Sequence, residues 1–236
     1  MIKRLRNYFS PHELTLLAAS LAAVLAAFLI FGGKSRLTLL ASMIGVVFLM
    51  LNAKANPIGQ LLTIVFSVLY GYISYSFGYY GEMITYLGMT APMALFSLIS
   101  WLRHPFGGRR SEVEVNAVSP AETVFAAILT AAVTALFYFI LKALGTANII
   151  LSTVSVTTSF AAVYLTFLRS PYFALAYAMN DLVLVALWAL ASAKDRSYVS
   201  VTVCFAVFFI NDLYGLISWR RIRARQEKER ERMGMG

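Results

Sequence analysis

Charged residues and cysteine are both scarce in this chain of 236 residues. Only 13% of the residues are charged, about half the share found in a typical soluble domain, whereas 60% are hydrophobic. The single cysteine, Cys204, excludes a disulfide within the chain and any metal or redox site built from several cysteines. His-Glu-x-x-His, Gly-x-Ser-x-Gly and phosphate-binding Gly-rich motifs are missing as well. We therefore expect no enzymatic activity, no catalytic residue, no metal and no cofactor.

Long apolar runs take up most of the sequence instead. About 20 apolar residues are needed for a helix to cross the hydrocarbon of a bilayer. Runs of about this length lie at 12–32, 37–53, 58–78, 83–102, 121–143, 147–168, 171–193 and 198–218. The sequence predicts an all-α polytopic membrane protein with eight transmembrane helices in a lipid bilayer.

The basic residues indicate the orientation of these helices. The net charge of +9 is typical of nucleic-acid binding, but the basic residues do not gather on one soluble face, so we expect no nucleic-acid partner. If both termini are cytoplasmic, fifteen of the 20 Lys and Arg residues lie on the cytoplasmic side, as the positive-inside rule requires. The charged tail 220–236 is then a solvated helical extension that touches anionic lipid, and a helix that binds a partner is the alternative.

An internal repeat organises the eight spans. Leu-Ile-Ser-Trp occurs twice, ending at Trp101 and at Trp219, and each copy is soon followed by arginine. The same shift of 118 residues aligns Tyr70 with Trp188. Two copies in the same direction need an odd number of spans between them. Parallel repeats of this kind are typical of transporters that hold a substrate between the two halves.

The repeat predicts two parallel three-helix bundles joined by an inverting linker helix, with an extra N-terminal helix. In ranges, these are an extra helix in 1–36, a first bundle in 37–102, a loop and linker helix in 103–146, a second bundle in 147–219, and the charged tail in 220–236.

Two carboxyl groups, Asp181 and Asp212, lie well inside predicted spans. A carboxylate in hydrocarbon costs at least about 2.5 kcal/mol, so such groups face a cavity or a polar partner. One interpretation is that they accept hydrogen bonds from the hydroxyl groups of a substrate. The alternative is that they hydrogen-bond to neighbouring helices and hold the bundles together.

Helical spacing adds further candidates on the same faces. Side chains at Phe173, Tyr177, Asp181 and Trp188 share one face of the seventh span. A second stripe runs along the third span and consists of Gln60, Thr63, Ser67, Tyr70 and Ser74. The shift of 118 sets Thr63 against Asp181, so we expect the two faces to oppose each other; close helix packing is the alternative for the stripe. The candidate substrate-binding residues are Gln60, Thr63, Ser67, Tyr70, Phe173, Tyr177, Asn180, Asp181, Trp188, Asn211 and Asp212.

Several short stretches resemble the PnuC family, bacterial vitamin transporters best known for nicotinamide riboside. They are Asn56-Pro57-Ile58-Gly59, Leu69-Tyr70-Gly71-Tyr72-Ile73, Tyr79-Tyr80-Gly81, Asp181, Leu187-Trp188, Ser197-Tyr198, Tyr214-Gly215 and Trp219. The resemblance covers residues 37 to 225 and implies the three-plus-one-plus-three fold also found in SWEET sugar transporters. It further implies facilitated diffusion of a nucleoside-like vitamin across the bacterial inner membrane, and a cytoplasmic kinase that traps the vitamin.

Two departures from the family concern the substrate. Gln60 stands where riboside transporters usually have tryptophan, and the segment 171–177 contains Tyr and Phe where they have tryptophans. A riboside permease is the first hypothesis. A proton-coupled symporter of thiamine, riboflavin or a deoxynucleoside is the second, and a non-transporting membrane subunit is the third. Association of identical chains stays open.

Overall fold

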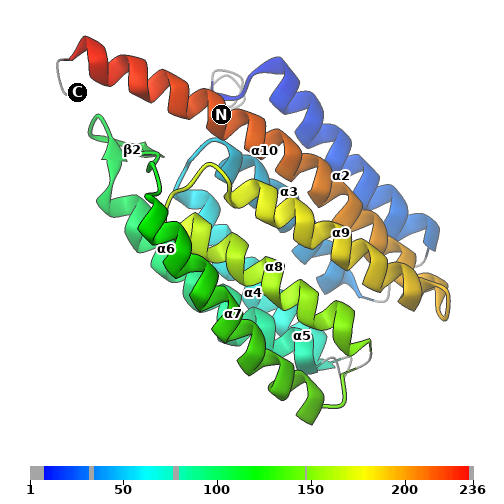
Figure 1. Ribbon diagram of the computed structural model, residues 1–236. Coiled ribbons are helices and arrows are strands. Elements are labelled where there is room, and N and C mark those ends of the chain that lie inside the picture. Colours follow the sequence, from blue (N-terminus) through cyan, green and yellow to red (C-terminus); the bar gives the residue numbers. More distant parts are fainter. Residues whose placement is uncertain (1–7, 32–34, 77–79, 147, 234–236) are drawn as a thin grey trace.

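The structure, a computed structural model, describes residues 8–31, 35–76, 80–146 and 148–233 (Figure 1). Within this part of the chain, eight helical segments are long and apolar enough to cross a membrane, which confirms the predicted spans. The elements are α2 (Pro11–Phe31), α3 (Arg36–Ala53), α4 (Ile58–Ser76), α5 (Tyr80–Ile84), the π-helix η1 (Thr85–Thr90), α6 (Ala91–Arg103), β1 (Pro105–Phe106), β2 (Arg109–Val113), α7 (Pro120–Ala143), α8 (Ile149–Phe167), α9 (Phe173–Ser192), the 3₁₀ helix η2 (Arg196–Tyr198) and α10 (Val199–Arg232).

Two three-helix bundles form the centre of the molecule. Helices α3, α4 and α5–α6 pack together as the first bundle, and α8, α9 and α10 as the second. The last helix of each bundle also packs on the first helix of the other, α6 on α8 and α10 on α3. These two contacts are equivalent, as expected when the bundles are parallel repeats of one another. The linker helix α7 lies along α8, and the extra helix α2 packs against α3 and α10.

The two copies of Leu-Ile-Ser-Trp hold the bundles together. The indole Nε1 of Trp101 in α6 donates to the carbonyl of Thr166 in α8 at 2.9 Å, and that of Trp219 in α10 donates to the carbonyl of Asn52 in α3 at 2.7 Å. Both side chains are fully buried, and the centroids of their rings are 5.4 Å apart. The repeated tetrapeptide therefore marks a reciprocal clamp in which each bundle binds the first helix of the other.

The repeat is not in a single register, however. Ala55 and Arg169 follow α3 and α8 with left-handed φ angles of 54° and 58°, and each precedes a polar residue and then a proline. These equivalent turns are 114 residues apart, whereas the clamp tryptophans are 118 apart. Since α4 and α9 follow the turns without a break, Asp181 corresponds to Ser67. The predicted match between Thr63 and Asp181 is wrong.

The extra helix α2 and the linker helix α7 begin in the same way. Ser10 and Glu13 form a reciprocal cap, in which the Ser10 N–H donates to the Glu13 carboxylate at 2.6 Å and the Glu13 N–H to the Ser10 hydroxyl at 3.3 Å. Ser119 and Glu122 repeat this pair at 2.8 and 3.2 Å. Such capping boxes satisfy backbone donors that a helix start leaves unpaired. The two helices thus hold equivalent places, each preceding a three-helix bundle.

The loop after α6 folds as a hairpin at the end of the molecule where α10 leaves the bundles (Figure 1). Strands β1 and β2 are antiparallel, and both Gly107 and Gly108 in their turn have positive φ angles. Residues 113–116, which we call the strap, then cross both bundles. The Val113 N–H donates to the Ala55 carbonyl at 2.9 Å, and the Asn116 N–H to the Arg169 carbonyl at 3.1 Å. The end with hairpin and strap is called the hairpin end below.

The charged tail holds the strap in place. Helix α10 continues to Arg232, as predicted, but one side chain of the tail, Gln226, is only 2% exposed. Its amide oxygen accepts from the Val115 N–H at 2.9 Å, and its amide nitrogen donates to the Val113 carbonyl at 3.0 Å. Ion pairs of Arg225 with Glu112 and of Arg230 with Glu114 flank this contact. The tail is therefore packed along one side, and the prediction of a wholly solvated extension is wrong.

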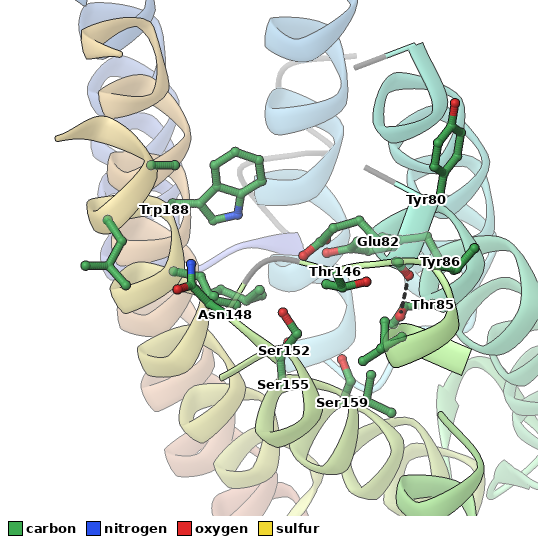
Figure 2. Close-up of a pocket in the computed structure, with 18 of the residues that line it drawn as sticks. Tyr80, Glu82, Thr85, Tyr86, Thr146, Asn148, Ser152, Ser155, Ser159 and Trp188 are labelled. Atoms are coloured by element: carbon green, nitrogen blue, oxygen red, sulfur yellow. Dashed lines mark hydrogen bonds between the residues drawn. The ribbon is translucent and has the colours of Figure 1, made fainter. Parts of the chain in front are cut away.

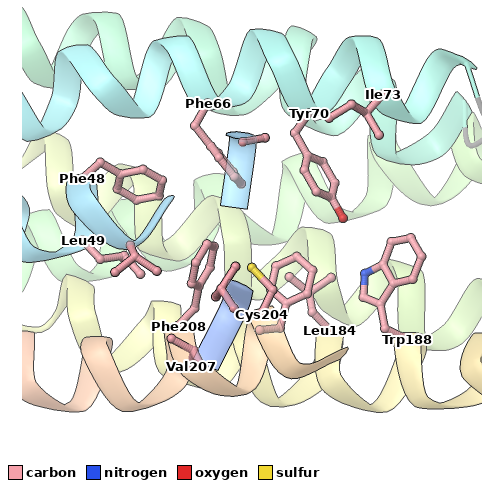
Figure 3. Close-up of a cluster of buried hydrophobic side chains, with 14 residues drawn as sticks. Phe48, Leu49, Phe66, Tyr70, Ile73, Leu184, Trp188, Cys204, Val207 and Phe208 are labelled. Atoms are coloured by element: carbon pink, nitrogen blue, oxygen red, sulfur yellow. The ribbon is translucent and has the colours of Figure 1, made fainter. Parts of the chain in front are cut away.

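The apolar core lies between α4 on one side and α9 and α10 on the other (Figure 3). Phe66 and Tyr70 of α4 point across this layer toward Trp188 of α9 and Phe208 of α10 (Figure 3). Phe208 lies against Gly45 of α3, where a Cβ atom would be only 2.2 Å from its ring. Tyr70 and Trp188 therefore lie opposite each other across the core, but Gln60 and Thr63 of the α4 stripe hydrogen-bond toward α3, so the predicted facing of the whole stripes is not found.

Candidate functional site

A cavity of about 690 Å³ lies between the two bundles, at the end opposite the hairpin. The first bundle contributes α5 and η1, the second contributes α8 and α9, and the C-terminal end of α7 completes the wall. Ligand sites of proteins commonly have volumes of roughly 300–1,000 Å³. Its polar and aromatic lining includes Tyr80, Glu82, Thr85, Tyr86, Thr146, Asn148, Ser152, Ser155, Ser159, Trp188, Lys194 and Tyr198 (Figure 2).

One wall of the cavity is a row of hydroxyl groups on α8. Ser152, Ser155 and Ser159 follow one another at i, i+3 and i+7, which places them on one face of the helix (Figure 2). Serine hydroxyls both donate and accept hydrogen bonds, as a sugar requires. This row was not among the predicted site residues, although its spacing is visible in the run 147–168.

The opposite wall contains an irregular helix. The π-helix η1 lies between α5 and α6, and the Thr90 hydroxyl donates to the Thr85 carbonyl five residues earlier at 3.2 Å. Pro92 just beyond it has no backbone N–H for the preceding turn, a common cause of such irregularity. Single π-turns are rare in proteins as a whole, but those that occur are often found at functional sites. Here the turn supplies Thr85 and Tyr86 to the cavity.

Aromatic rings from both bundles flank the cavity. Trp188 comes from α9 and Tyr86 from η1, on opposite sides (Figure 2). The Trp188 ring packs on Tyr198, with the centroids 5.5 Å apart, and the Tyr86 ring packs on Tyr70 at 4.6 Å. These neighbours fix the two rings, so a flat aromatic ligand can stack between or beside them.

Of the eleven predicted site residues, Trp188 alone lines this cavity. The stripe on α4 is buried against α3. The Gln60 amide donates to Asn52 Oδ1 at 2.9 Å, the Asn52 amide to the Thr63 hydroxyl at 3.4 Å, and the Ser67 hydroxyl to the Thr63 carbonyl at 2.8 Å. These contacts are those of the alternative interpretation, close helix packing.

The aromatic residues at the start of α9 lie at the hairpin end. The Phe173 ring packs on that of Trp219 at 4.8 Å, and the Tyr177 ring lies 6.1 Å from that of Phe173. Both belong to the surroundings of the tryptophan clamp, away from the cavity lining.

A second polar layer lies next to the cavity, about one helical turn before Leu184, the first residue of α9 in the lining. Asn180 Oδ1 accepts from the Ser155 hydroxyl at 3.2 Å and from the Thr158 hydroxyl at 2.9 Å, and Ser155 itself lines the cavity. Asp181 and Asp212 are both 4% exposed, and their carboxyl groups interact with each other between α9 and α10. No ion pair is formed by either one within the described residues.

Asn211 has a different partner. Its amide nitrogen donates to the Ser20 hydroxyl of α2 at 2.9 Å and to the Val207 carbonyl at 2.8 Å. It therefore joins α10 to the extra helix. A role of Asn211 in substrate binding stays a prediction, as it does for the other candidates.

Two further acidic residues, Glu82 and Glu13, point into the protein interior, and neither was among the predicted site residues. Glu82 lies in the cavity wall, near the start of its span. Glu13 of α2 forms a partly buried ion pair with Lys54 at 3.0 Å and accepts a hydrogen bond from the Tyr214 hydroxyl at 2.8 Å. Both lie near the end of a span, so a search for acidic groups deep within spans passes over them.

Comparison with known proteins identifies the family. The chain is similar over 197 residues to the nicotinamide riboside transporter PnuC of Neisseria mucosa, with 26% identity over 82% of this chain and 75% of the relative. The fold matches the crystal structure of the vitamin B3 transporter PnuC with a TM-score of 0.78 at 23% identity, over 92% of this chain and 94% of the other. The family model described as nicotinamide mononucleotide transporter matches residues 35–221. The chain therefore belongs to the nicotinamide mononucleotide transporter family, a family of multi-pass membrane transporters.

Proposed function

We propose that this protein is a permease for nicotinamide riboside or a closely similar nucleoside-like vitamin. The observation that carries the proposal is the cavity between the two bundles. It combines flanking aromatic rings, Trp188 and Tyr86, with a row of serine hydroxyls. An aromatic base can stack on the rings while the sugar hydroxyls bind to the serines. The name of the relative from Neisseria mucosa agrees with this substrate.

The lining favours the riboside over its phosphorylated form. Phosphate groups are usually bound by arginine, by lysine or by backbone N–H groups at a helix start, and the start of α8 after Asn148 is part of this lining. Among the described lining residues the basic one is Lys194, which is exposed beyond the end of α9, whereas Glu82 supplies a carboxyl group. A phosphate deep in this cavity would meet a negative charge.

The proposed mechanism is alternating access of the two bundles. The strap and the tryptophan clamp close the hairpin end, and the cavity lies at the other end. Access from the hairpin end requires α6 to separate from α8 and α10 from α3 there. The distribution of basic residues supports a cytoplasmic hairpin end in a bacterial inner membrane. Transport is then facilitated diffusion, and a cytoplasmic kinase that phosphorylates the vitamin would trap it.

A second candidate is proton-coupled symport, favoured by the Asp181–Asp212 pair. Two neighbouring buried carboxylates repel each other, and one proton shared between them removes the repulsion. Such a pair can carry a proton between the two sides. Transport assays distinguish this candidate from facilitated diffusion. If transport is facilitated diffusion, as we propose, uptake into proteoliposomes with the membrane potential held at zero should be the same with and without a pH gradient. Uphill accumulation driven by the gradient would establish symport instead.

The substrate is tested by binding to the purified protein. Calorimetric titration with nicotinamide riboside, nicotinamide mononucleotide, thiamine, riboflavin and deoxynucleosides should give the highest affinity for the riboside. Trp188→Ala should weaken that binding by roughly tenfold, since a stacked aromatic partner contributes about 0.5–1.5 kcal/mol beyond the apolar area it covers. Tighter binding of the mononucleotide than of the riboside would reject the proposal.

A further inference from the structure

A carboxyl group projects into the cavity from the first bundle. Glu82 belongs to the short helix α5, and Figure 2 shows its side chain reaching toward the middle of the cavity. Within the described residues no Lys or Arg lies within ion-pair distance of it. Ionisable residues within transmembrane segments commonly face a cavity and mark the path of a substrate or ion, and Glu82 faces the cavity from the first turn of its span. A cavity built for neutral ligands would not require one.

The surroundings of Glu82 are aromatic. Tyr86 stands one helical turn further along, Trp188 lies across the cavity, and Tyr80 and Tyr198 also contribute to the lining. The faces of aromatic rings attract cations, and sites that bind organic cations combine such rings with negative charge. The other charged group of the described lining, Lys194, is exposed, so it does not neutralise the interior of the cavity.

We propose that Glu82 makes the cavity selective for substrates whose aromatic ring carries a delocalised positive charge. This inference rests on the proposed function and makes its substrate class narrower. Oxidised nicotinamide riboside has such a ring, a pyridinium. Its 1,4-dihydro form has the same sugar hydroxyls and nearly the same shape but no charge. Glu82 therefore distinguishes between two forms of one nucleoside by charge alone.

The test measures the affinities for both forms in the wild-type protein and in Glu82→Gln. Glutamine keeps the size of the side chain and removes its charge. The wild type should bind the oxidised form roughly ten- to hundredfold more tightly than the dihydro form, because an interaction with a charged group is lost in the latter. Glu82→Gln should lose this factor for the oxidised form and change the dihydro affinity by less than about twofold.

Two further variants serve as controls. Glu82→Asp keeps the charge and should retain most of the preference, which also shows that the site tolerates substitution. Lys142→Gln changes a charge at the exposed end of α7, outside the cavity lining, and should leave the preference unaltered. Equal losses for both forms in Glu82→Gln, or no loss for either, would overturn the inference while leaving the permease intact. Failure of the wild type to bind either form would reject the proposed function and the inference together.

Discussion

Replacement of Gln226 by alanine should release the strap from the hairpin end. The Gln226 side chain is 2% exposed and binds the backbone N–H of Val115 and the carbonyl of Val113. Alanine leaves both groups without this partner in the docked state, and a buried unsatisfied group costs about 1–3 kcal/mol. Loss of one such interaction lowers the docking equilibrium constant by roughly five- to 150-fold, because about 1.4 kcal/mol corresponds to tenfold.

Limited proteolysis under native conditions measures this release. Arg109 and Arg110 lie in β2, so trypsin cleaves after them in proportion to the fraction of molecules with an open hairpin. Mass spectrometry resolves cleavage there from cleavage in the tail. Lys228→Ala is the matched control, because Lys228 is an exposed residue of the same helix. Cleavage of Gln226→Ala at the wild-type rate would refute the assignment of Gln226 as the residue that holds the strap.

Three other outcomes follow from contacts in the interior. Asp181→Ala should change the substrate dissociation constant by less than about twofold, because Asp181 lies outside the cavity lining and contacts Asp212; a loss of roughly one to two decades, the effect of removing a hydrogen bond to a charged group worth about 1.5–3 kcal/mol, would instead assign Asp181 to substrate binding. Trp101→Phe and Trp219→Phe each remove one indole donor of the clamp and should lower the melting temperature by similar amounts, whereas a large inequality would contradict a reciprocal clamp. Gly45→Ala should destabilise the protein by about 1–3 kcal/mol, because the added methyl group overlaps the Phe208 ring; thermal unfolding at the wild-type temperature would disprove this.

The architecture was predictable because membrane physics constrains it closely. A helix must be long and apolar enough to cross the hydrocarbon, so the spans can be read from the sequence with errors of a few residues at their ends. The repeated tryptophan correctly predicted the parallel bundles, because the two indoles occupy equivalent places in the clamp and therefore recur at equivalent places in the sequence. The register between the copies was less secure, because one shared tetrapeptide cannot reveal a four-residue change elsewhere in the repeat.

The cavity was harder to predict. A small polar residue on a transmembrane helix can face a cavity or a neighbouring helix, and both give the same spacing in the sequence. Thr63 faces α3 and Ser155 faces the cavity, although both look alike in the sequence. Glu82 lies in α5, directly before the π-helix, and Tyr86 lies within it. The 3.6-residue period of an α-helix does not predict which way side chains point where the winding changes.

The strap was outside the reach of sequence patterns for another reason. Its hydrogen bonds join residues 113–116 to Ala55, Arg169 and Gln226, which are far apart in the chain. The tail alternates basic and acidic residues like an exposed helix, and a single buried glutamine does not alter that pattern. The contact depends on the tertiary fold, which places the tail beside the hairpin.

A structure of the protein with bound nicotinamide riboside tests the central claim most directly. The claim is that the substrate occupies the cavity between the bundles, and it predicts the pyridinium ring within about 6 Å of the Trp188 or Tyr86 ring centroid. The ribose hydroxyls should bind to serines of α8, with the Glu82 carboxyl group beside the ring. A riboside bound instead against Gln60 and Thr63, or outside both bundles, would contradict the account.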